Sequence, residues 1–139
     1  MVQTDSNLAV VMILVNQDKI LLLKRTQEPI CWGPPSGRIH VGEPIEDAVH
    51  RELKEETALT AKIIMPVQVW QGPHRGVDVT AITYVCETSD YAVVLSDEHS
   101  AFQWICLDKL TDIKDTVFDL KKWPALIKAA KAFIDSSIH

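Results

Sequence analysis

Short apolar runs alternate with polar turns along the amino-terminal part of the chain. Leu8 to Val15 and Lys19 to Arg25 are rich in aliphatic and β-branched residues, and the polar Asn16-Gln17-Asp18 separates them. Runs of this length, bounded by turn residues, predict two β-strands joined as a hairpin. Three later runs of the same kind predict further strands: Lys62 to Trp70, Val77 to Glu87 and Phe102 to Leu107.

Two other segments have a helical period. Within Pro44 to Leu59, apolar residues recur every four positions, and Pro44 fits the first position of a helix. A second amphipathic helix is predicted near the carboxyl end, where Pro124 lies near the start of an apolar stripe formed by Trp123, Ile127, Ala130 and Ile134.

The segment from Gln27 to Gly42 contains three prolines and three glycines, which predict a long stiff loop with a short strand inside. The resulting order of strands and helices predicts an α/β fold with a mixed sheet and helices packed on it. Because the chain contains no internal repeat or Gly/Ser linker, one domain over residues 1–139 is expected.

The composition of the chain argues against several classes of function and structure. The 14 Lys and Arg residues against 19 Asp and Glu residues give a net charge of −5 and no basic stripe for extended nucleic acid, whereas a small phosphorylated ligand held by a metal ion stays open. The three cysteines are far apart and form no CxxC pair, which argues against a disulfide framework or a zinc knuckle. The chain shows no secretory signal and no apolar run long enough to span a membrane, so a cytoplasmic location is expected.

The first predicted helix carries a cluster of carboxylates. On a helical wheel, Glu52, Glu55 and Glu56 fall within a sector of about 100° that overlaps the apolar face, so all three are expected to lean toward the protein. Partly buried carboxylates repel one another unless a cation lies between them, and Mg²⁺ or Mn²⁺ suits an all-oxygen site. For a Glu-rich helix alone, the commoner alternative is a solvated face with Arg51 and Lys54 as counter-charges.

The wider pattern favours the metal site. Residues 37–59 read Gly37-x5-Glu43-x7-Arg51-Glu52-Leu53-x-Glu55-Glu56-x-Ala58-Leu59. This resembles the Nudix box of the Nudix (MutT-like) hydrolases, G-x5-E-x7-R-E-U-x-E-E-x-G-U, in which U is a bulky aliphatic residue. The resemblance implies a Nudix-type α/β/α sandwich. It also implies hydrolysis, by a metal-activated water, of the pyrophosphate linkage in a nucleoside diphosphate joined to another group X.

Two residues depart from the family pattern. Ala58 replaces the last glycine of the box, and Ser36 replaces a glycine in the preceding loop, where Pro34-Pro35-Ser36-Gly37 stands in place of a more usual Leu-Pro-Gly-Gly. A left-handed residue with a Cβ costs about 1 kcal/mol or more, so Ala58 predicts either a different helix end or a tolerated strain. Neither departure removes a carboxylate.

The resemblance also implies a role for each box residue. Glu52, Glu55 and Glu56 match the carboxylates that bind the metal, directly or through water. Gly37 matches the box glycine, whose missing side chain allows close backbone approach, and a carbonyl just before it could complete the coordination. Glu43 is expected to brace the box or the start of the helix rather than bind the metal.

Catalysis is assigned to Glu52, Glu56, Glu98 and Arg51. Arg51 is expected to orient the glutamates through charge-assisted hydrogen bonds. The proton acceptor is either Glu52 or Glu98, and the alternative for Glu98 is a solvated turn residue. His99 is expected to be structural or a substrate contact.

Substrate contacts are predicted on the flanks of the box. Arg25 and Arg38 are candidates for phosphate binding, although strand alternation lets only one of Lys24 and Arg25 face the site. Trp32 either stacks on a base or packs in the core. The remaining tryptophans are expected in the core: Trp70, Trp104 and Trp123.

The nucleotide and the group X stay open. The ADP-ribose and dinucleoside-polyphosphate branches of the family are marked by a proline or a tyrosine after the box. In this chain those positions hold Arg75, Gly76 and Val77, so neither substrate is predicted. The chief alternative function is a non-catalytic, nucleotide-sensing Nudix-fold module. Such modules usually lack a box glutamate, whereas this chain retains them all. A purely structural metal or interaction domain is a third hypothesis. A homodimer is left open.

Overall fold

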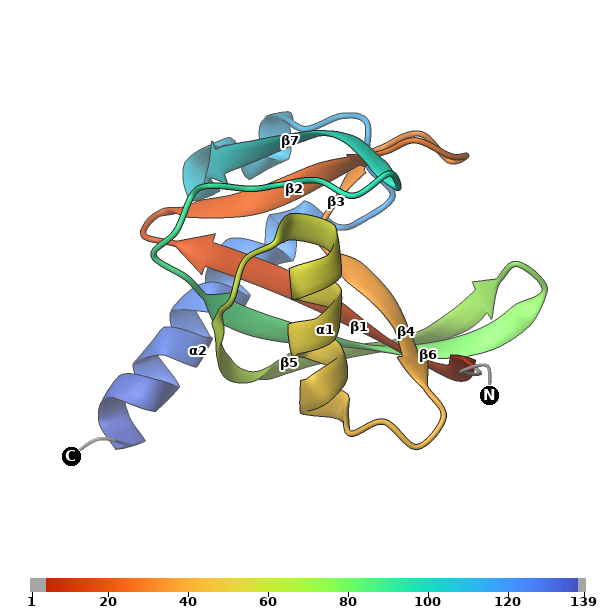
Figure 1. Cartoon of the computed structure of the whole chain (residues 1–139). Helices are drawn as coiled ribbons and strands as arrows, with labels where there is room; N and C mark the ends of the chain where they lie inside the picture. The colour runs from red at the N-terminus through yellow and green to blue at the C-terminus, as the bar shows by residue number, and fades with distance from the viewer. Residues whose placement is uncertain (1–4, 138–139) are drawn as a thin grey trace.

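Seven strands form one mixed sheet between two helices in residues 5–137, the part of the chain that the computed structural model describes (Figure 1). The remaining residues of the expected 1–139 domain, 1–4 and 138–139, lie outside the described residues. The strands are β1 (Asp5–Asn16), β2 (Lys19–Arg25), β3 (Trp32–Gly33), β4 (Ser36–His40), β5 (Lys62–His74), β6 (Val77–Glu87) and β7 (His99–Cys106). The helices are α1 (Ile45–Thr57) and α2 (Trp123–Ser137), and short 3-10 helices span Leu107–Asp112 and Leu120–Lys122.

The sheet divides between β1 and β2. These strands pair only next to their turn, at Val15 with Ile20 and at Asn16 with Lys19. Further along, β4 pairs with β1 and β3 pairs with β2, while β1 also runs parallel to β6 and β2 pairs with β7. The segment that carries β3 and β4 therefore passes from one half of the sheet to the other.

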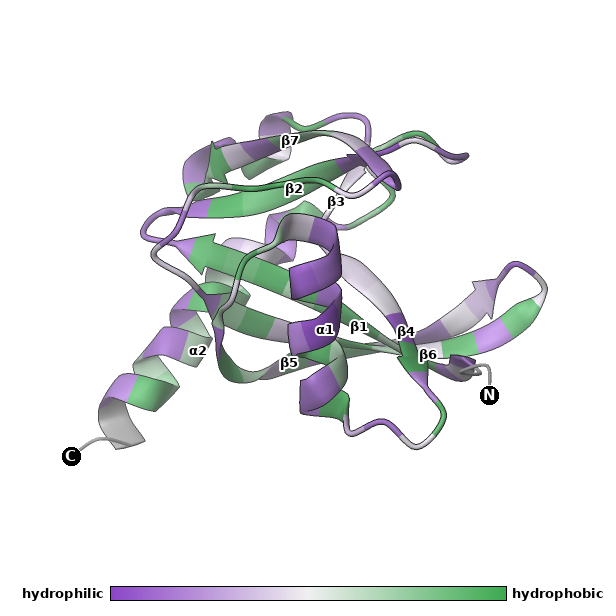
Figure 2. Ribbon diagram, in the orientation of Figure 1, coloured by the Kyte–Doolittle hydropathy of each residue, from purple (hydrophilic) through white to green (hydrophobic). Residues whose placement is uncertain are grey.

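Two apolar cores lie on opposite faces of the sheet, because side chains of a strand alternate between its faces. Val10 and Met12 of β1 belong to the core beneath α1, whereas Ile13 and Val15 belong to the core beneath α2. The apolar face of α1, formed by Ala48, Val49 and Leu53 with Ile45 at its edge, packs as predicted. Figure 2 shows the matching pattern, with apolar strands inside and a hydrophilic outer surface on α1.

The predicted α/β class, the two helices and the five main strands are confirmed, with three corrections. Pro44 caps α1 in an extended conformation (ψ 143°), so Ile45 is the first helical residue. The Pro-rich loop contains two short strands instead of one, since each half of the divided sheet takes one as a partner. Trp70 is 52% exposed, because β5 continues to His74 as part of a long hairpin.

The other expected core tryptophans pack inside. Trp123 is buried in the core beneath α2, and Trp104 is partly buried against the core beneath α1. Trp32 is partly buried against the core beneath α2. Among residues 5–137, neither helix combines the length and the apolar character that crossing a membrane requires.

Helix α1 ends at a left-handed alanine. Ala58 has φ 63° and ψ 11°, and its N–H donates to the Lys54 carbonyl at 3.0 Å. The helix therefore ends as a glycine would end it, and of the two expectations for Ala58 the tolerated strain is correct. The Thr57 hydroxyl supports this end, since it donates to the Leu53 carbonyl (2.6 Å) and accepts from the Leu59 N–H (3.1 Å).

Replacing Ala58 with glycine should stabilise the protein. Ala58→Gly removes the steric cost of a Cβ at positive φ, and the greater freedom of glycine in the unfolded chain offsets part of the gain, leaving about 0.5–1 kcal/mol. Thermal or urea unfolding measures the change. The matched control is Ala129→Gly on the exposed side of α2, where the same substitution should destabilise by about 1 kcal/mol. A loss of stability in both variants would contradict the strain at Ala58.

Candidate metal and catalytic site

Helix α1 places two carboxylates one turn apart on its protein-facing side. Glu52 is 9% exposed and Glu56 is 4% exposed. A side chain on Gly37 of β4 would collide with the Glu52 carboxylate, and the Ser36 N–H donates to Glu56 Oε2 at 3.0 Å. The absence of a side chain at Gly37 thus lets the Glu52 carboxylate approach the backbone of β4 closely, while Glu56 approaches the same strand at Ser36.

Arg51 joins α1 to the loop before it. Its Nε and Nη2 donate to the two Glu43 oxygens at 2.8 and 3.0 Å, its Nη1 donates to Glu52 Oε1 at 2.9 Å, and its Nη2 also donates to the Arg38 carbonyl at 2.9 Å. Hydrogen bonds from Arg51 hold the pKa of Glu43 at about 2, so this carboxylate is ionised. The Arg51 guanidinium is thus occupied by Glu43, Glu52 and backbone; its orienting role and the bracing role of Glu43 stay predictions.

Glu55 does not join the buried pair, contrary to the expectation from the helical wheel. Its side chain is 58% exposed, and its hydrogen bond is with Arg51 Nη1 at 3.3 Å. The reason is angular: residues four apart nearly align along a helix, whereas Glu55 lies about 100° around the axis from Glu56. Glu55 therefore flanks the site from the solvent side.

Glu98 and His99 reach the site from the start of β7. One ligand atom from each of Glu56, Glu98 and His99 can be chosen so that all three lie within 4.8 Å of one another. The sequence placed Glu98 near the box, as the structure does, but gave His99 only a structural or substrate-contact role. Two adjacent ligand-type residues ahead of a strand were the available signal for His99.

Without a cation, the ionised forms of the two buried carboxylates, Glu52 and Glu56, are disfavoured. Burial raises the pKa of Glu52 to about 7 against the opposing effect of Arg51, and burial together with the Glu52 charge raises the pKa of Glu56 to about 9. Within residues 5–137, no Lys or Arg side chain forms an ion pair with Glu56. Several carboxylate oxygens around a small space, without a local counter-charge for Glu56, fit a divalent cation such as Mg²⁺ or Mn²⁺.

The face of the sheet that points away from α1 carries a basic and an aromatic side chain instead of carboxylates. Because Gly37 faces α1, Arg38 faces the other side of the sheet. Arg38 pairs with Ala9, Ala9 with Ala81, and Ala81 with Trp70, so side chains at these positions share one face across four strands. A side chain on Gly72 would collide with the Trp70 ring, which therefore lies along β5. Trp70 is an exposed aromatic group on the same face as Arg38, a position that the expectation of core packing had missed.

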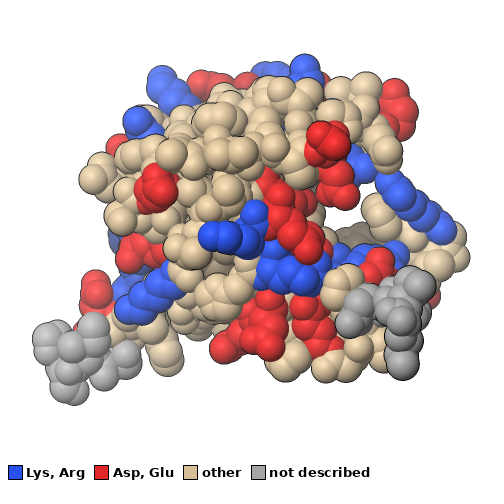
Figure 3. Space-filling model, in the orientation of Figure 1, with Lys and Arg blue, Asp and Glu red and all other residues tan. Residues whose placement is uncertain are grey.

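Basic groups surround this face. His74 follows Trp70 on the same side of β5, and burial lowers its pKa, helped by the charges of Arg75, Arg38 and Arg25. Arg25 Nε is buried and has no hydrogen-bond partner among the described residues. Figure 3, which views the molecule from the α1 side, shows acidic side chains with basic ones among them around α1, a hollow beside them, and further basic side chains on the far side of the hollow. This arrangement suits a ligand with several negative charges.

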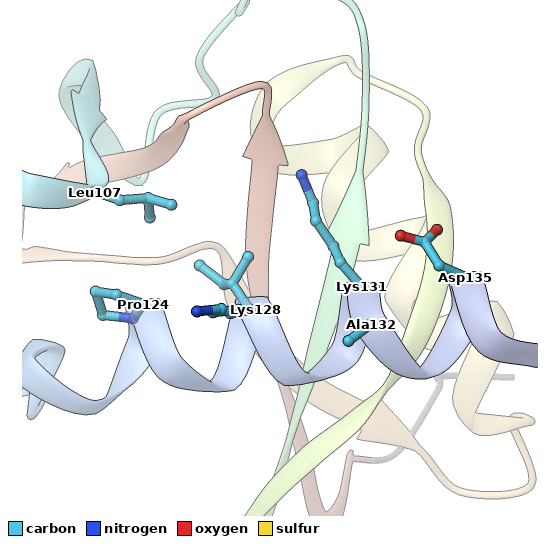
Figure 4. Close-up of a pocket in the computed structure, with 7 residues that line it drawn as sticks. Leu107, Pro124, Lys128, Lys131, Ala132 and Asp135 are labelled. Carbon is cyan, nitrogen blue, oxygen red and sulfur yellow. The ribbon is translucent and has the colours of Figure 1, made fainter.

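A second depression lies beside α2 (Figure 4). None of the candidate site residues lines it. Lys131 at its edge forms an ion pair with Glu87 at 3.6 Å. The lining residues are Leu107, Pro124, Ile127, Lys128, Lys131, Ala132 and Asp135.

Known proteins match both the sequence and the fold. A family model described as NUDIX domain matches residues 5–126. The chain is 30% identical over 119 residues to the ADP-ribose pyrophosphatase of Methanocaldococcus jannaschii, covering 80% of this chain and 70% of that protein. It is 31% identical over 102 residues to the putative 8-oxo-dGTP diphosphatase of Bacillus subtilis, covering 73% and 67%. A NUDIX family hydrolase from Clostridium perfringens superimposes with a TM-score of 0.77 at 19% identity, over 91% of this chain and 97% of that one, which shows the fold.

The raised pKa values predict how stability changes with pH when metal is absent. A carboxyl whose pKa is higher in the folded state binds protons that the unfolded chain has released, so the free energy of unfolding should fall as the pH rises above the ordinary value of 4.5 through about 7 and 9. Denaturant unfolding in EDTA measures this slope. Glu56→Gln should flatten it, whereas Glu46→Gln, at an exposed position in the first turn of α1, should leave it unchanged. A parallel slope in E56Q would refute the assignment.

Proposed function

This chain belongs to the Nudix family, and from that premise we propose that it is a Mg²⁺-dependent pyrophosphohydrolase acting on a nucleoside diphosphate linked to another group X. The observation that carries this proposal is the meeting of Glu52, Glu56 and Glu98 from two distant parts of the chain beside Gly37. A pyrophosphate repels nucleophiles, so its hydrolysis requires neutralised charge, an aligned water and a proton acceptor. Candidate groups for these tasks lie together here.

The metal would be held by Glu52, Glu56 and Glu98, with His99 within ligand distance and Glu55 at the solvent side. Mg²⁺ is proposed as the resident ion and Mn²⁺ as a substitute, since carboxylate oxygens suit both and an imidazole nitrogen favours Mn²⁺ of the two. When bound, such an ion neutralises phosphate oxygens and lowers the pKa of a coordinated water. The buried carboxylates would then stay ionised at neutral pH.

The protein's own groups divide the remaining work. Arg51 fixes the position of Glu52 through a 2.9 Å hydrogen bond and keeps Glu43 ionised as a brace. Either Glu52 or Glu98 accepts the proton of the attacking water.

The basic and aromatic face supports a nucleotide as the substrate class. Arg25 and Arg38 can contact phosphate oxygens, and Trp70 offers an exposed ring for a base, in addition to the partly buried Trp32. The relatives' names point to different nucleotides, ADP-ribose in one case and 8-oxo-dGTP in another. The proposal therefore names the class and leaves the particular base and X to a substrate panel.

A nucleotide-sensing module without turnover is the alternative. It would show a melting shift with nucleotide and metal but release no product. The complete set of box glutamates favours the enzyme. A cytoplasmic location, a homodimer and a single domain over residues 1–139 stay predictions from the sequence.

Removing the most buried carboxylate should abolish most of the activity. Glu56→Gln deletes a charge of the metal site while keeping the hydrogen bond from Ser36 sterically possible, and kcat should fall about a hundredfold or more. The assay is product release from a nucleotide panel with Mg²⁺, and EDTA should stop it. Glu46→Gln is the control that keeps full activity. An E56Q protein as active as the parent would end the assignment.

Trp70 should matter for substrates that contain a base. Base stacking on an aromatic side chain contributes about 1–3 kcal/mol, so Trp70→Ala should raise KM for nucleotides about tenfold, with a smaller change for Trp70→Phe. Hydrolysis of inorganic tripolyphosphate, which has no base, should be unaffected by either substitution. Equal losses on nucleotide and tripolyphosphate would show that Trp70 only supports the hairpin.

A further inference from the structure

We propose that Thr26 is a positioning residue for Glu98: its hydroxyl and backbone N–H together fix the chain at the start of β7 so that the Glu98 carboxylate meets Glu56. This inference rests on the proposed function, because it concerns how one carboxylate of that same site is held. Thr26 lies outside the box and follows the last residue of β2.

Two donors of one residue converge on the Glu98 backbone. The Thr26 N–H donates to the Glu98 carbonyl at 3.1 Å, and the Thr26 hydroxyl reaches the same oxygen at 3.1 Å and the Asp97 carbonyl at 3.4 Å. A threonine hydroxyl has a single proton, so it donates to one of these carbonyls at a time. Thr26 is exposed and could bond to water instead, yet its hydroxyl is directed at the segment that carries Glu98.

The strand pairing explains why the backbone at Glu98 depends on additional hydrogen bonds for its position. Lys24 pairs with Ala101 and Arg25 pairs with His99, so Ser100 is an extra residue in β7 at this point of the ladder. A bulge of this kind interrupts the ladder and redirects side chains next to it. Beyond the bulge the regular pairing ends, and the bonds from Thr26 extend the contact between the two strands to Glu98.

The hydrogen bonds from the preceding turn to this segment are longer. Glu98 N–H donates to Ser96 Oγ at 3.4 Å, and His99 N–H donates to the Ser96 carbonyl at 3.4 Å. Both come from the turn on one side, whereas the two 3.1 Å hydrogen bonds from Thr26 to the Glu98 carbonyl are shorter and come from β2 on the other side. The ligand-distance grouping of Glu56, Glu98 and His99 depends on where this backbone lies.

The experiment is a double-mutant cycle between Thr26 and Glu98. Thr26→Val deletes the hydroxyl with little change of shape, Thr26→Ser keeps it, and Glu98→Gln removes the charge being positioned. The readouts are the Kd for Mn²⁺ from titration of the electron paramagnetic resonance signal of the free ion, and kcat with Mg²⁺. Thr88→Val is the matched control, since its hydroxyl accepts a hydrogen bond from Asp90 N–H in another loop.

T26V should weaken Mn²⁺ binding and lower kcat about three- to tenfold, the range expected for losing one hydrogen bond. T26S should restore most of both values, and T88V should change neither. In the E98Q background, T26V should have a clearly smaller effect, because the carboxylate that Thr26 positions is already lost and only His99 remains to be displaced.

Unchanged Mn²⁺ affinity and kcat in T26V would overturn the proposal. The same fold loss in the parent and in the E98Q background would also overturn it, since Thr26 would then act on general stability. A parent that binds no Mn²⁺ would overturn it as well. Coupled Mn²⁺ binding without hydrolysis of any nucleotide would instead contradict the proposed function and leave the positioning role of Thr26 standing.

Discussion

Two glutamates of α1, Glu52 and Glu56, are buried against the backbone of β4, and carboxylates in such a place are costly unless charge and hydrogen bonds compensate. One part of the compensation is local: Arg51 pairs with Glu52 and is itself held by Glu43. Glu56 has no such partner among the described residues, and burial together with the Glu52 charge raises its pKa to about 9. The packing of α1 against β4 keeps the Glu52 and Glu56 carboxylates where a cation can reach them.

The division of the sheet creates that location. Since β1 and β2 separate soon after their turn, β4 and the start of β7 lie on opposite sides of the gap and can both approach α1. Gly37 then admits Glu52 where any side chain would exclude it. The carboxyl end of β2 holds the start of β7 in place. A regular, continuously paired sheet would close the space that the carboxylates share.

Periodicity and box spacing were enough to predict the helices, the main strands and the buried face of α1, because these depend on local patterns of two and about four residues. Glu98 was predicted only through the family resemblance, since its proximity to Glu56 arises from strand pairing between distant segments. Trp70 was misplaced because an apolar residue in a strand is buried only where the opposite layer extends that far, and the extent of α2 is a tertiary property. Glu55 was misplaced because a wide sector on the wheel spans both the buried face and its exposed margin.

Strand β4 connects the two chemical halves of the site. Gly37 faces the carboxylates of α1, and its neighbour Arg38 faces the surface that carries Trp70 and the basic groups. Arg51 ties the halves together, since its guanidinium bonds both to Glu52 and to the Arg38 carbonyl. Under the proposed function, a nucleotide would therefore place its base on one side of β4 and its diphosphate at the gap in the sheet. Because Arg51 bonds to both, a movement of β4 at Arg38 would be transmitted to the Glu52 carboxylate, and the same bonds leave the Arg51 guanidinium occupied within the protein.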